Sequence, residues 1–114
     1  MFTEETIAKF KNTPTPFYYY DLGLLKKTLE RLTTESNKYG FVVHYAMKAN
    51  TNAEILNVIR GFDIGADCVS GNEVKRAIET KFSPNDIVFA GVGKSDEEIN
   101  YALDQSIFCF NCES

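Results

Sequence analysis

Residues 41–50, FVVHYAMKAN, join an apolar run to a lysine at its end. Aromatic and β-branched residues favour strands, so we expect a strand over residues 41–46. Side chains alternate along a strand, which places Lys48 on the same face as His44 and Ala46. The opposite face is more apolar and is expected to pack against helices; it consists of Phe41, Val43, Tyr45 and Met47.

Helical and strand-like segments alternate on both sides of this stretch. Asp21 is a good N-cap for a helix that runs to about Lys38, and Gly40 follows its end. Ser-x-x-Glu spacings at 70–73 and 95–98 are typical of capping boxes at two later helix starts. The other expected elements are helices from Thr3 to about Phe10 and from about Asn52, and strands at 17–20, 66–70, 87–91 and 107–110.

This alternation predicts an α/β fold with a parallel sheet and crossover helices. The units repeat every 20–25 residues or so, a period compatible with a (β/α)₈ barrel, which averages roughly 30 residues per unit and needs roughly 250 in all. The 114 residues are therefore expected to form the first half of such a barrel, with residues 1–114 belonging to its N-terminal part.

Composition limits the classes of protein that the chain can belong to. Hydrophobic residues make up 44% and charged residues 25%, which is typical of a globular protein. A net charge of −4 argues against nucleic acid as the main partner, and no apolar run is long enough to span a membrane. The first ten residues lack the pattern of a signal peptide. Three cysteines without a secretory context favour reduced thiols and a cytoplasmic location.

Lys48 is the first candidate functional residue. Barrel enzymes place their sites at the carboxyl ends of the strands, which is where this lysine is expected. A lysine that is partly desolvated there can supply a free amine for bonding to a carbonyl carbon. The alternative is a strand-terminal lysine that only reaches solvent. Position in the sequence does not decide between the two.

Two other motifs are weaker. The segment GVGKS (91–95) ends like a phosphate-binding loop, but Val88 stands where that pattern requires glycine. What remains is a loop that lets Lys94 approach an anion. The Cys-x-x-Cys of Cys109 and Cys112 lacks a second ligand pair at zinc spacing and lies in a strand, so we expect no metal site.

His44, Asp67 and Glu73 complete the set of candidates. His44 is the single histidine, and a packed barrel-interior histidine is a better interpretation than a catalytic one. Asp67 alternates with its apolar neighbours, so an inward orientation would bring its carboxylate near Lys48. Glu73 completes a capping box, and it serves either that structural purpose alone or the site as well.

The order and spacing of several segments resemble those of diaminopimelate decarboxylases, which are pyridoxal-5′-phosphate enzymes with a barrel of the alanine racemase type. The resemblance extends from about Thr15 to Ser114. It departs at Asn72, where glycine is usual, and at Met47 and Cys112, where valine is usual. The segments are TPFYYYDL, HYAMKAN, GADCVSGNE, IVFAGVGKSDEEI and FNCES.

The resemblance implies a role for each candidate residue. It implies that Lys48 bonds covalently to pyridoxal phosphate, that Ala46 is the small residue beside the cofactor ring, and that Asp67 lies near the bond. Glu73 is implied to support the site from farther out, and His44 is a second candidate for such support. The segment FYYYD would belong to a β domain that also uses the C-terminal part of the protein.

The implied reaction is the decarboxylation of meso-2,6-diaminopimelate to L-lysine and CO₂, the last step of lysine biosynthesis. The substrate is then a small amino acid, and the full-length protein is expected to be a homodimer. The family's phosphate loop, pyridine-nitrogen partner and C-terminal domain follow the matched segments, so the 114 residues are expected to be a fragment that is inactive alone. An ornithine- or arginine-type decarboxylase and a non-catalytic, cofactor-binding or regulatory paralogue remain alternatives.

Overall fold

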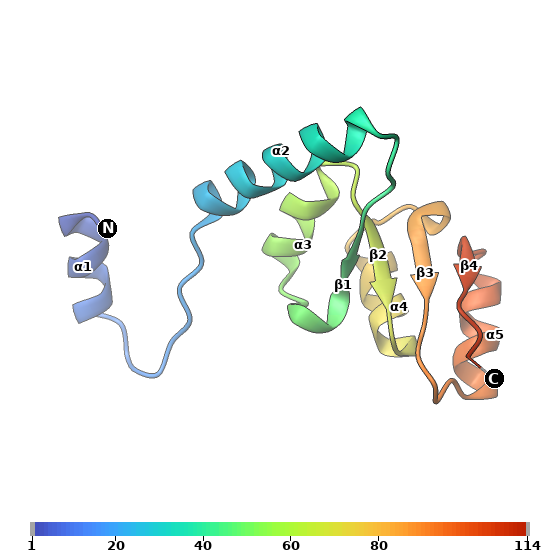
Figure 1. The fold of residues 1–114 in the computed structure, drawn as a ribbon. Coiled ribbons are helices and arrows are strands. Elements are labelled where there is room, and N and C mark those ends of the chain that lie inside the picture. The colour runs from blue at the N-terminus through green and yellow to red at the C-terminus, as the bar shows by residue number, and fades with distance from the viewer. Residues whose placement is uncertain (1, 114) are drawn as a thin grey trace.

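The computed structural model describes residues 2–113, so Met1 and Ser114, the last residue of FNCES, lie outside the described part. Four short strands form one sheet, and helices accompany them along the chain (Figure 1). The strands are β1 (His44–Ala46), β2 (Gly65–Cys68), β3 (Ile87–Phe89) and β4 (Cys109–Phe110). The helices are α1 (Glu4–Lys11), α2 (Leu22–Lys38), α3 (Ala53–Arg60), α4 (Gly71–Glu79) and α5 (Asp96–Asp104), with 3₁₀ turns η1 (Met47–Ala49) and η2 (Pro84–Asp86).

The sheet is parallel, and its strand order β1-β2-β3-β4 follows the chain. The order does not reverse, so these strands lack the switch point of a doubly wound sheet and wind in one direction, as in a barrel. Equivalent register positions recur every 21 residues, at 46, 67, 88 and 109. The expected α/β class, with parallel strands and a barrel-like arrangement, is confirmed.

The two faces of the sheet differ sharply in burial. One face carries Ala66, Cys68, Ile87 and Phe89, all fully buried against the helices. Helix α4 packs against β2 and β3, and it also contacts α5. The opposite face is only half covered, so it is the face on which side chains remain accessible. It is equivalent to the interior of a complete barrel.

Side-chain caps explain where the helices begin. Oxygens of Thr3, Asp21, Asn52, Ser70 and Ser95 each accept a hydrogen bond from a backbone N–H in the first turn of the following helix. These contacts satisfy amides that have no partner within the helix. The expected helix starts are therefore confirmed. Gly40 has a φ of 68°, the left-handed conformation that commonly follows a helix end.

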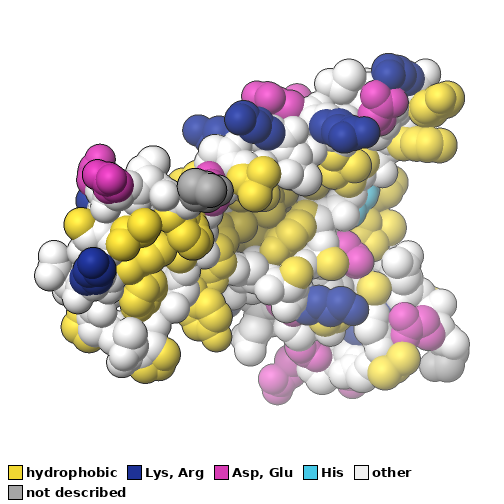
Figure 2. Space-filling model, turned by 60° about the vertical axis from the view of Figure 1, so that its left-hand side comes forward, with side chains coloured by type: hydrophobic (Ala, Val, Ile, Leu, Met, Phe, Trp, Pro, Cys, Tyr) yellow, Lys and Arg dark blue, Asp and Glu magenta, His cyan; other side chains and the backbone are white. Residues whose placement is uncertain are grey.

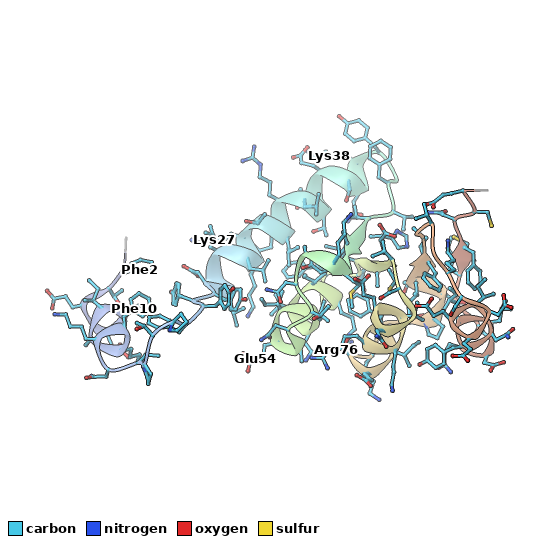
Figure 3. All side chains as sticks on the ribbon, turned by 90° about the horizontal axis from the view of Figure 1, so that it is seen from below. Phe2, Phe10, Lys27, Lys38, Glu54 and Arg76 are labelled. Atoms are coloured by element: carbon cyan, nitrogen blue, oxygen red, sulfur yellow. The ribbon has the colours of Figure 1, made fainter. Side chains whose placement is uncertain are left out.

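The prediction of a strand at 17–20 is wrong. This segment is extended but has no partner strand among the described residues, and a strand exists only as part of a hydrogen-bonded ladder. It joins α1 to α2, and α1 together with residues 12–21 forms an arm that extends away from the sheet (Figure 1). The ring centroid of Phe10 lies 5.2 Å from that of Phe2 and 5.1 Å from that of Tyr19, and Figure 3 shows Phe2, which precedes α1, close to Phe10 on that helix.

The surface carries apolar side chains on the arm and in the hollow beside it, as Figure 2 shows. Tyr18 is 89% exposed, while the neighbouring aromatic residues of the arm are about half covered by one another. The helices within residues 2–113 are all too short or too polar to cross a membrane.

Candidate active site

One row of side chains crosses the accessible face of the sheet. Ala46 pairs in register with Asp67, Asp67 with Val88, and Val88 with Cys109. All four are half-buried, in contrast to the fully buried residues on the helix-facing side. The expected inward orientation of Asp67 agrees with this arrangement. Ala46 and Asp67 are therefore neighbours on one surface, near the carboxyl ends of their strands.

Lys48 lies two residues beyond Ala46, but not in a strand. Strand β1 ends at Ala46, and Lys48 belongs to the 3₁₀ turn η1. Met47 is fully buried and anchors this turn in the core, while Lys48 is exposed. The expected desolvation of its amine is therefore not seen. Among the described residues Lys48 forms no hydrogen bond or ion pair, so its amine is accessible from the solvent.

Asn50 fixes the chain just after the lysine. Its carbonyl oxygen accepts a hydrogen bond from the Tyr45 hydroxyl at 3.2 Å, and its side-chain oxygen accepts one from the Asn52 amide at 2.8 Å. Its side-chain nitrogen also donates to the Tyr20 hydroxyl at 3.1 Å. The segment YAMKAN thus forms a turn that is held on both sides of Lys48. This restraint reduces the conformational freedom of the lysine backbone.

Asp67 contains the unsatisfied polar atom of this face. Its Oδ1 is buried and has no hydrogen-bond partner among the described residues. Leaving such an atom unpaired costs about 1–3 kcal/mol, so a hydrogen-bond donor is expected to meet it in the working site.

The Cys68 thiol lies on the opposite face of β2. Burial raises its pKa to about 12, and the charges of Glu73 and Asp67 add to the effect.

Glu73 serves the loop after β2. Its Oε2 accepts a hydrogen bond from the Val69 amide at 2.7 Å, and its own amide donates to Ser70 Oγ at 3.2 Å. The carboxylate therefore reaches one residue further back than the N-cap position that a capping box would use. Glu73 holds the segment that follows Asp67, which is compatible with a supporting role at the site.

His44 packs over Gly65, its register partner on β2. A Cβ atom built on Gly65 would lie 2.5 Å from His44 Cδ2 and 2.8 Å from Nε2. The half-buried imidazole therefore needs a glycine beneath it. This contact agrees with a packed interior histidine at the amino end of the two strands, two residues before the Ala46–Asp67 pair.

Lys94, expected to approach an anion, has protein carbonyl oxygens as its partners in the structure. Its Nζ donates to the carbonyl oxygens of Gly91 and of Asn111, the latter at 2.8 Å, and lies 5.5 Å from the centre of the Phe89 ring. The cation thus joins the chain after β3 to the chain after β4. Because Asn111 is 17 residues away, no local spacing in the sequence indicates this contact.

No two cysteines are joined by a disulfide among the described residues; Cys112 is exposed and Cys109 is half-buried on the accessible face of the sheet. Within residues 2–113 no group of three or more His, Cys, Asp or Glu side chains is placed to hold a metal ion.

The described residues fit part of a pyridoxal phosphate site. An accessible amine at Lys48 matches the need for a covalent attachment point, and the unpaired Asp67 Oδ1 matches the need for an acceptor beside a cationic nitrogen. Ala46 leaves space between them because its side chain is a single methyl group. Residues that would hold the phosphate group are not evident in this arrangement.

Comparison with known proteins supports these features. Residues 22–114 match the family model described as the pyridoxal binding domain of pyridoxal-dependent decarboxylases. The chain is 53% identical over 109 residues to a diaminopimelate decarboxylase of Bacteroides thetaiotaomicron, covering 95% of this chain and 28% of that protein. It therefore spans little more than a quarter of that relative.

Solved structures give the same result. A crystal structure of diaminopimelate decarboxylase from Helicobacter pylori, complexed with L-lysine, matches with a TM-score of 0.85 and 40% identity, covering 96% of this chain and 28% of that one. An arginine decarboxylase of the Paramecium bursaria Chlorella virus matches with a TM-score of 0.69 and 27% identity, covering 78% and 25%. The chain thus belongs to the pyridoxal-dependent decarboxylases and comprises part of their pyridoxal binding domain, whose cofactor is pyridoxal phosphate.

Proposed function

We propose that this chain contributes the cofactor-attaching part of an enzyme that decarboxylates meso-2,6-diaminopimelate to L-lysine and CO₂. The observation that carries the substrate is the 53% identity to a diaminopimelate decarboxylase. The match to arginine decarboxylase is weaker, at 27% identity, so an arginine- or ornithine-type activity is the second candidate. A paralogue that binds the cofactor without turnover is the third.

When bound, pyridoxal phosphate supplies an electron sink for the carbanion left by loss of CO₂. Lys48 binds the cofactor through its Nζ, which has to lose its proton before it can bond to a carbonyl carbon. The buried Asp67 Oδ1, which has no partner among the described residues, is available to accept a hydrogen bond from a cationic group of the bound cofactor. Ala46 provides room for a flat ring next to these two groups.

In this proposal Glu73 and His44 support the site without contacting the reacting atoms. Glu73 fixes the Val69 amide, and so the direction in which the chain leaves Asp67. His44 fills the space above Gly65 and closes the amino-terminal side of the same face. Both restrain the strand that carries the carboxylate without touching the reacting atoms.

The 114 residues alone should not turn over substrate, because orientation of the reactants supplies about 7–11 kcal/mol of barrier lowering in an assembled site. We assign the residues that contact the cofactor phosphate and the pyridine nitrogen to other parts of the full-length protein.

The full-length protein is proposed to be a homodimer in the cytoplasm. Light scattering of the full-length protein tests the dimer. Residues 1–114 would then belong to the barrel domain's N-terminal part.

The attachment residue is tested by reducing the full-length protein with borohydride in the presence of pyridoxal phosphate and mapping the modified peptide. Label is expected on Lys48 and should vanish in Lys48→Arg. The matched control is Lys94→Arg, which should keep the label on Lys48 because Lys94 is held by two carbonyl oxygens and is not the attachment point. Label on Lys94, with Lys48 unmodified, would refute the assignment.

The substrate is tested separately by CO₂ release from meso-diaminopimelate, ornithine and arginine at equal concentrations. Preference for meso-diaminopimelate is expected. Preference for ornithine or arginine supports the second candidate. Label on Lys48 without release from any of the three supports the third.

A further inference from the structure

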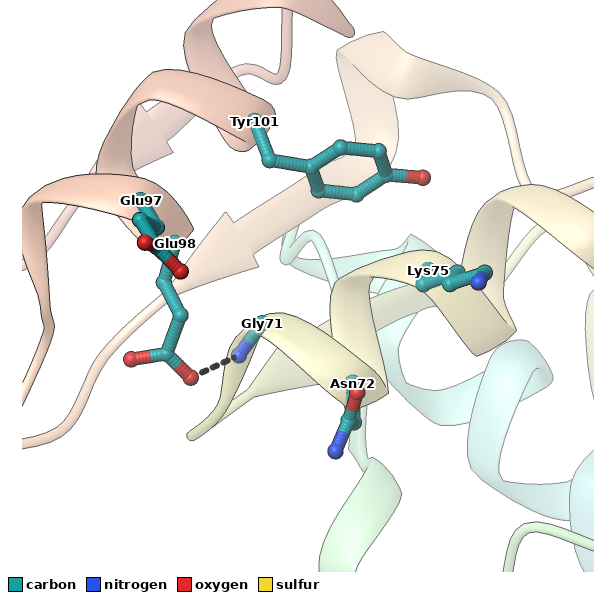
Figure 4. A pocket seen from close by; sticks show the side chains of 6 residues that line it. All are labelled: Gly71, Asn72, Lys75, Glu97, Glu98 and Tyr101. Atoms are coloured by element: carbon teal, nitrogen blue, oxygen red, sulfur yellow. Dashed lines mark hydrogen bonds between the residues drawn. The ribbon is translucent and has the colours of Figure 1, made fainter.

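A pocket of 250 Å³ lies between α4 and α5, on the helical side of the sheet, and Figure 4 shows Glu98 at its edge. The Glu98 carboxylate accepts two backbone hydrogen bonds. Its Oε1 accepts from the Gly71 amide at 2.7 Å, and its Oε2 accepts from the Ser95 amide at 3.0 Å. One side chain thus joins the beginnings of two successive helices.

The Ser95 contact completes a capping box, which the sequence predicts from local spacing. The Gly71 contact is different because it spans 27 residues and leaves the helix to which Glu98 belongs. Gly71 is the first residue of α4, where backbone amides have no partner within the helix. A carboxylate at this point also interacts favourably with the helix dipole.

Gly71 leaves room for the Glu98 side chain because it has no side chain of its own. A Cβ atom at this position would lie 2.6 Å from Glu98 Cγ and 3.1 Å from its Cβ. The absence of a side chain therefore lets the glutamate approach the backbone. The hydrogen bonds from Ser95 and Gly71 lower the pKa of Glu98, so the ionised form is the one that this geometry favours.

The restrained loop is the one that leaves the candidate site. Only Val69 and Ser70 separate strand β2, which carries Asp67, from Gly71. The Val69 amide is held by Glu73, and Gly71 is held by Glu98. The loop therefore has two carboxylate restraints, one from its own helix and one from the next βα unit.

We propose that Glu98 is a positioning residue for the cofactor site: its bond to Gly71 holds the β2–α4 loop and thereby the direction of the Asp67 carboxylate. This inference rests on the proposed function for its link to pyridoxal phosphate. It adds a residue from the α5 helix, outside the accessible face of the sheet, to the groups that shape the site.

The test compares four variants of the full-length protein. Glu98→Asp keeps the charge but is one methylene shorter, so it should lose the reach to Gly71. Gly71→Ala keeps Glu98 and pushes its Cγ away. Glu97→Asp is the matched control on the adjacent, exposed residue, and Ser95→Ala weakens the start of α5 without removing the partner of Gly71.

Two quantities are measured well below the melting temperature of every variant. Hydrogen exchange of the backbone amide at position 71, relative to its intrinsic rate, should become about threefold to tenfold faster in Glu98→Asp and Gly71→Ala, as expected for loss of one hydrogen bond. Release of pyridoxal phosphate from the loaded protein, followed by absorbance, should accelerate over a similar range. Glu97→Asp and Ser95→Ala should leave both quantities unchanged.

The outcomes separate this inference from the function on which it rests. Unchanged exchange at Gly71 in Glu98→Asp overturns the inference. Equal acceleration of cofactor release in Ser95→Ala and Glu98→Asp also overturns it, because the effect would then follow helix stability. If the wild-type protein takes up no pyridoxal phosphate at Lys48, the proposed function fails, and faster exchange confined to Glu98→Asp and Gly71→Ala still supports the restraint on the loop.

Discussion

Replacing Gly65 with alanine is expected to destabilise the protein because the space above this residue is already filled. The new Cβ would lie 2.5 Å from the Asp86 carbonyl oxygen and 2.5 Å from His44 Cδ2. The imidazole can rotate away, but the carbonyl belongs to the backbone just before β3. Relief therefore requires β2 to shift relative to β3. Overpacking of this kind costs about 1–3 kcal/mol.

Urea unfolding of the full-length protein, followed by circular dichroism, measures this cost. The slope is about 1–3 kcal/mol per molar urea for small proteins and grows with the surface exposed on unfolding, so a loss of about 2 kcal/mol should lower the midpoint by less than roughly 1 M. Gly93→Ala is the matched control, because a Cβ there meets nothing within 4 Å, and its effect should stay within about 0.5 kcal/mol.

The double variant His44→Ala/Gly65→Ala tests the cause. Removing the imidazole eliminates the side-chain clash but leaves the clash with the Asp86 carbonyl, so the added cost of Gly65→Ala should become smaller without disappearing. Equal midpoints for Gly65→Ala and Gly93→Ala would refute the reasoning. A full rescue by His44→Ala would show that the backbone contact is unimportant.

Three further predictions follow from burial, charge and the sheet edges. At pH 8, iodoacetamide should label the exposed Cys112 and spare Cys68 until the protein is denatured, because burial raises the pKa of Cys68 to about 12. Mass spectrometry of the peptides measures the label on each cysteine, and label on Cys68 before denaturation would contradict its burial. Because its pKa is lowered in the folded state, Glu98 stabilises the fold above its ordinary pKa of 4.5, and this contribution is lost as pH falls through the lowered value. The free energy of unfolding should therefore decline less steeply on acidification in Glu98→Gln than in Glu97→Gln. Identical declines in the two variants would argue against a stabilising role of the Glu98 carboxylate. The isolated 114 residues should self-associate, since β1 and β4 each have a free edge in the described sheet; a monodisperse monomer in light scattering would contradict this.

Helices were predictable from the sequence because their start signals are local. Ser95 and Glu98 are three residues apart, and the box that they form is present in the structure. The absence of a strand at 17–20 was not predictable, since aromatic composition indicates a tendency to pair but not the presence of a partner strand. The expected strand at 41–46 is likewise shorter in the structure: β1 begins at His44, although the Val43 carbonyl oxygen accepts a hydrogen bond from the Gly65 amide at 2.9 Å.

The candidate site was predictable only in outline. Alternation along β2 set Asp67 apart from Ala66 and Cys68, and the structure pairs it in register with Ala46. Alternation along β1 does not extend to Lys48, because β1 ends at Ala46 and Lys48 lies in the turn η1. The contacts of Lys94 with Asn111 and of Glu98 with Gly71 join residues 17 and 27 positions apart, and no spacing rule for a single element reports such pairs.

The constant 21-residue register has a consequence for how the chain acquires its structure. Each strand after β1 pairs with the strand that precedes it in the chain, in register at 46, 67, 88 and 109, so no strand pairing in the described sheet requires a segment from farther along the chain. Contact order is therefore low for a parallel sheet, and the entropy of loop closure is about the same at each addition. The sheet can grow from its amino-terminal strand in the order of synthesis, one βα unit at a time.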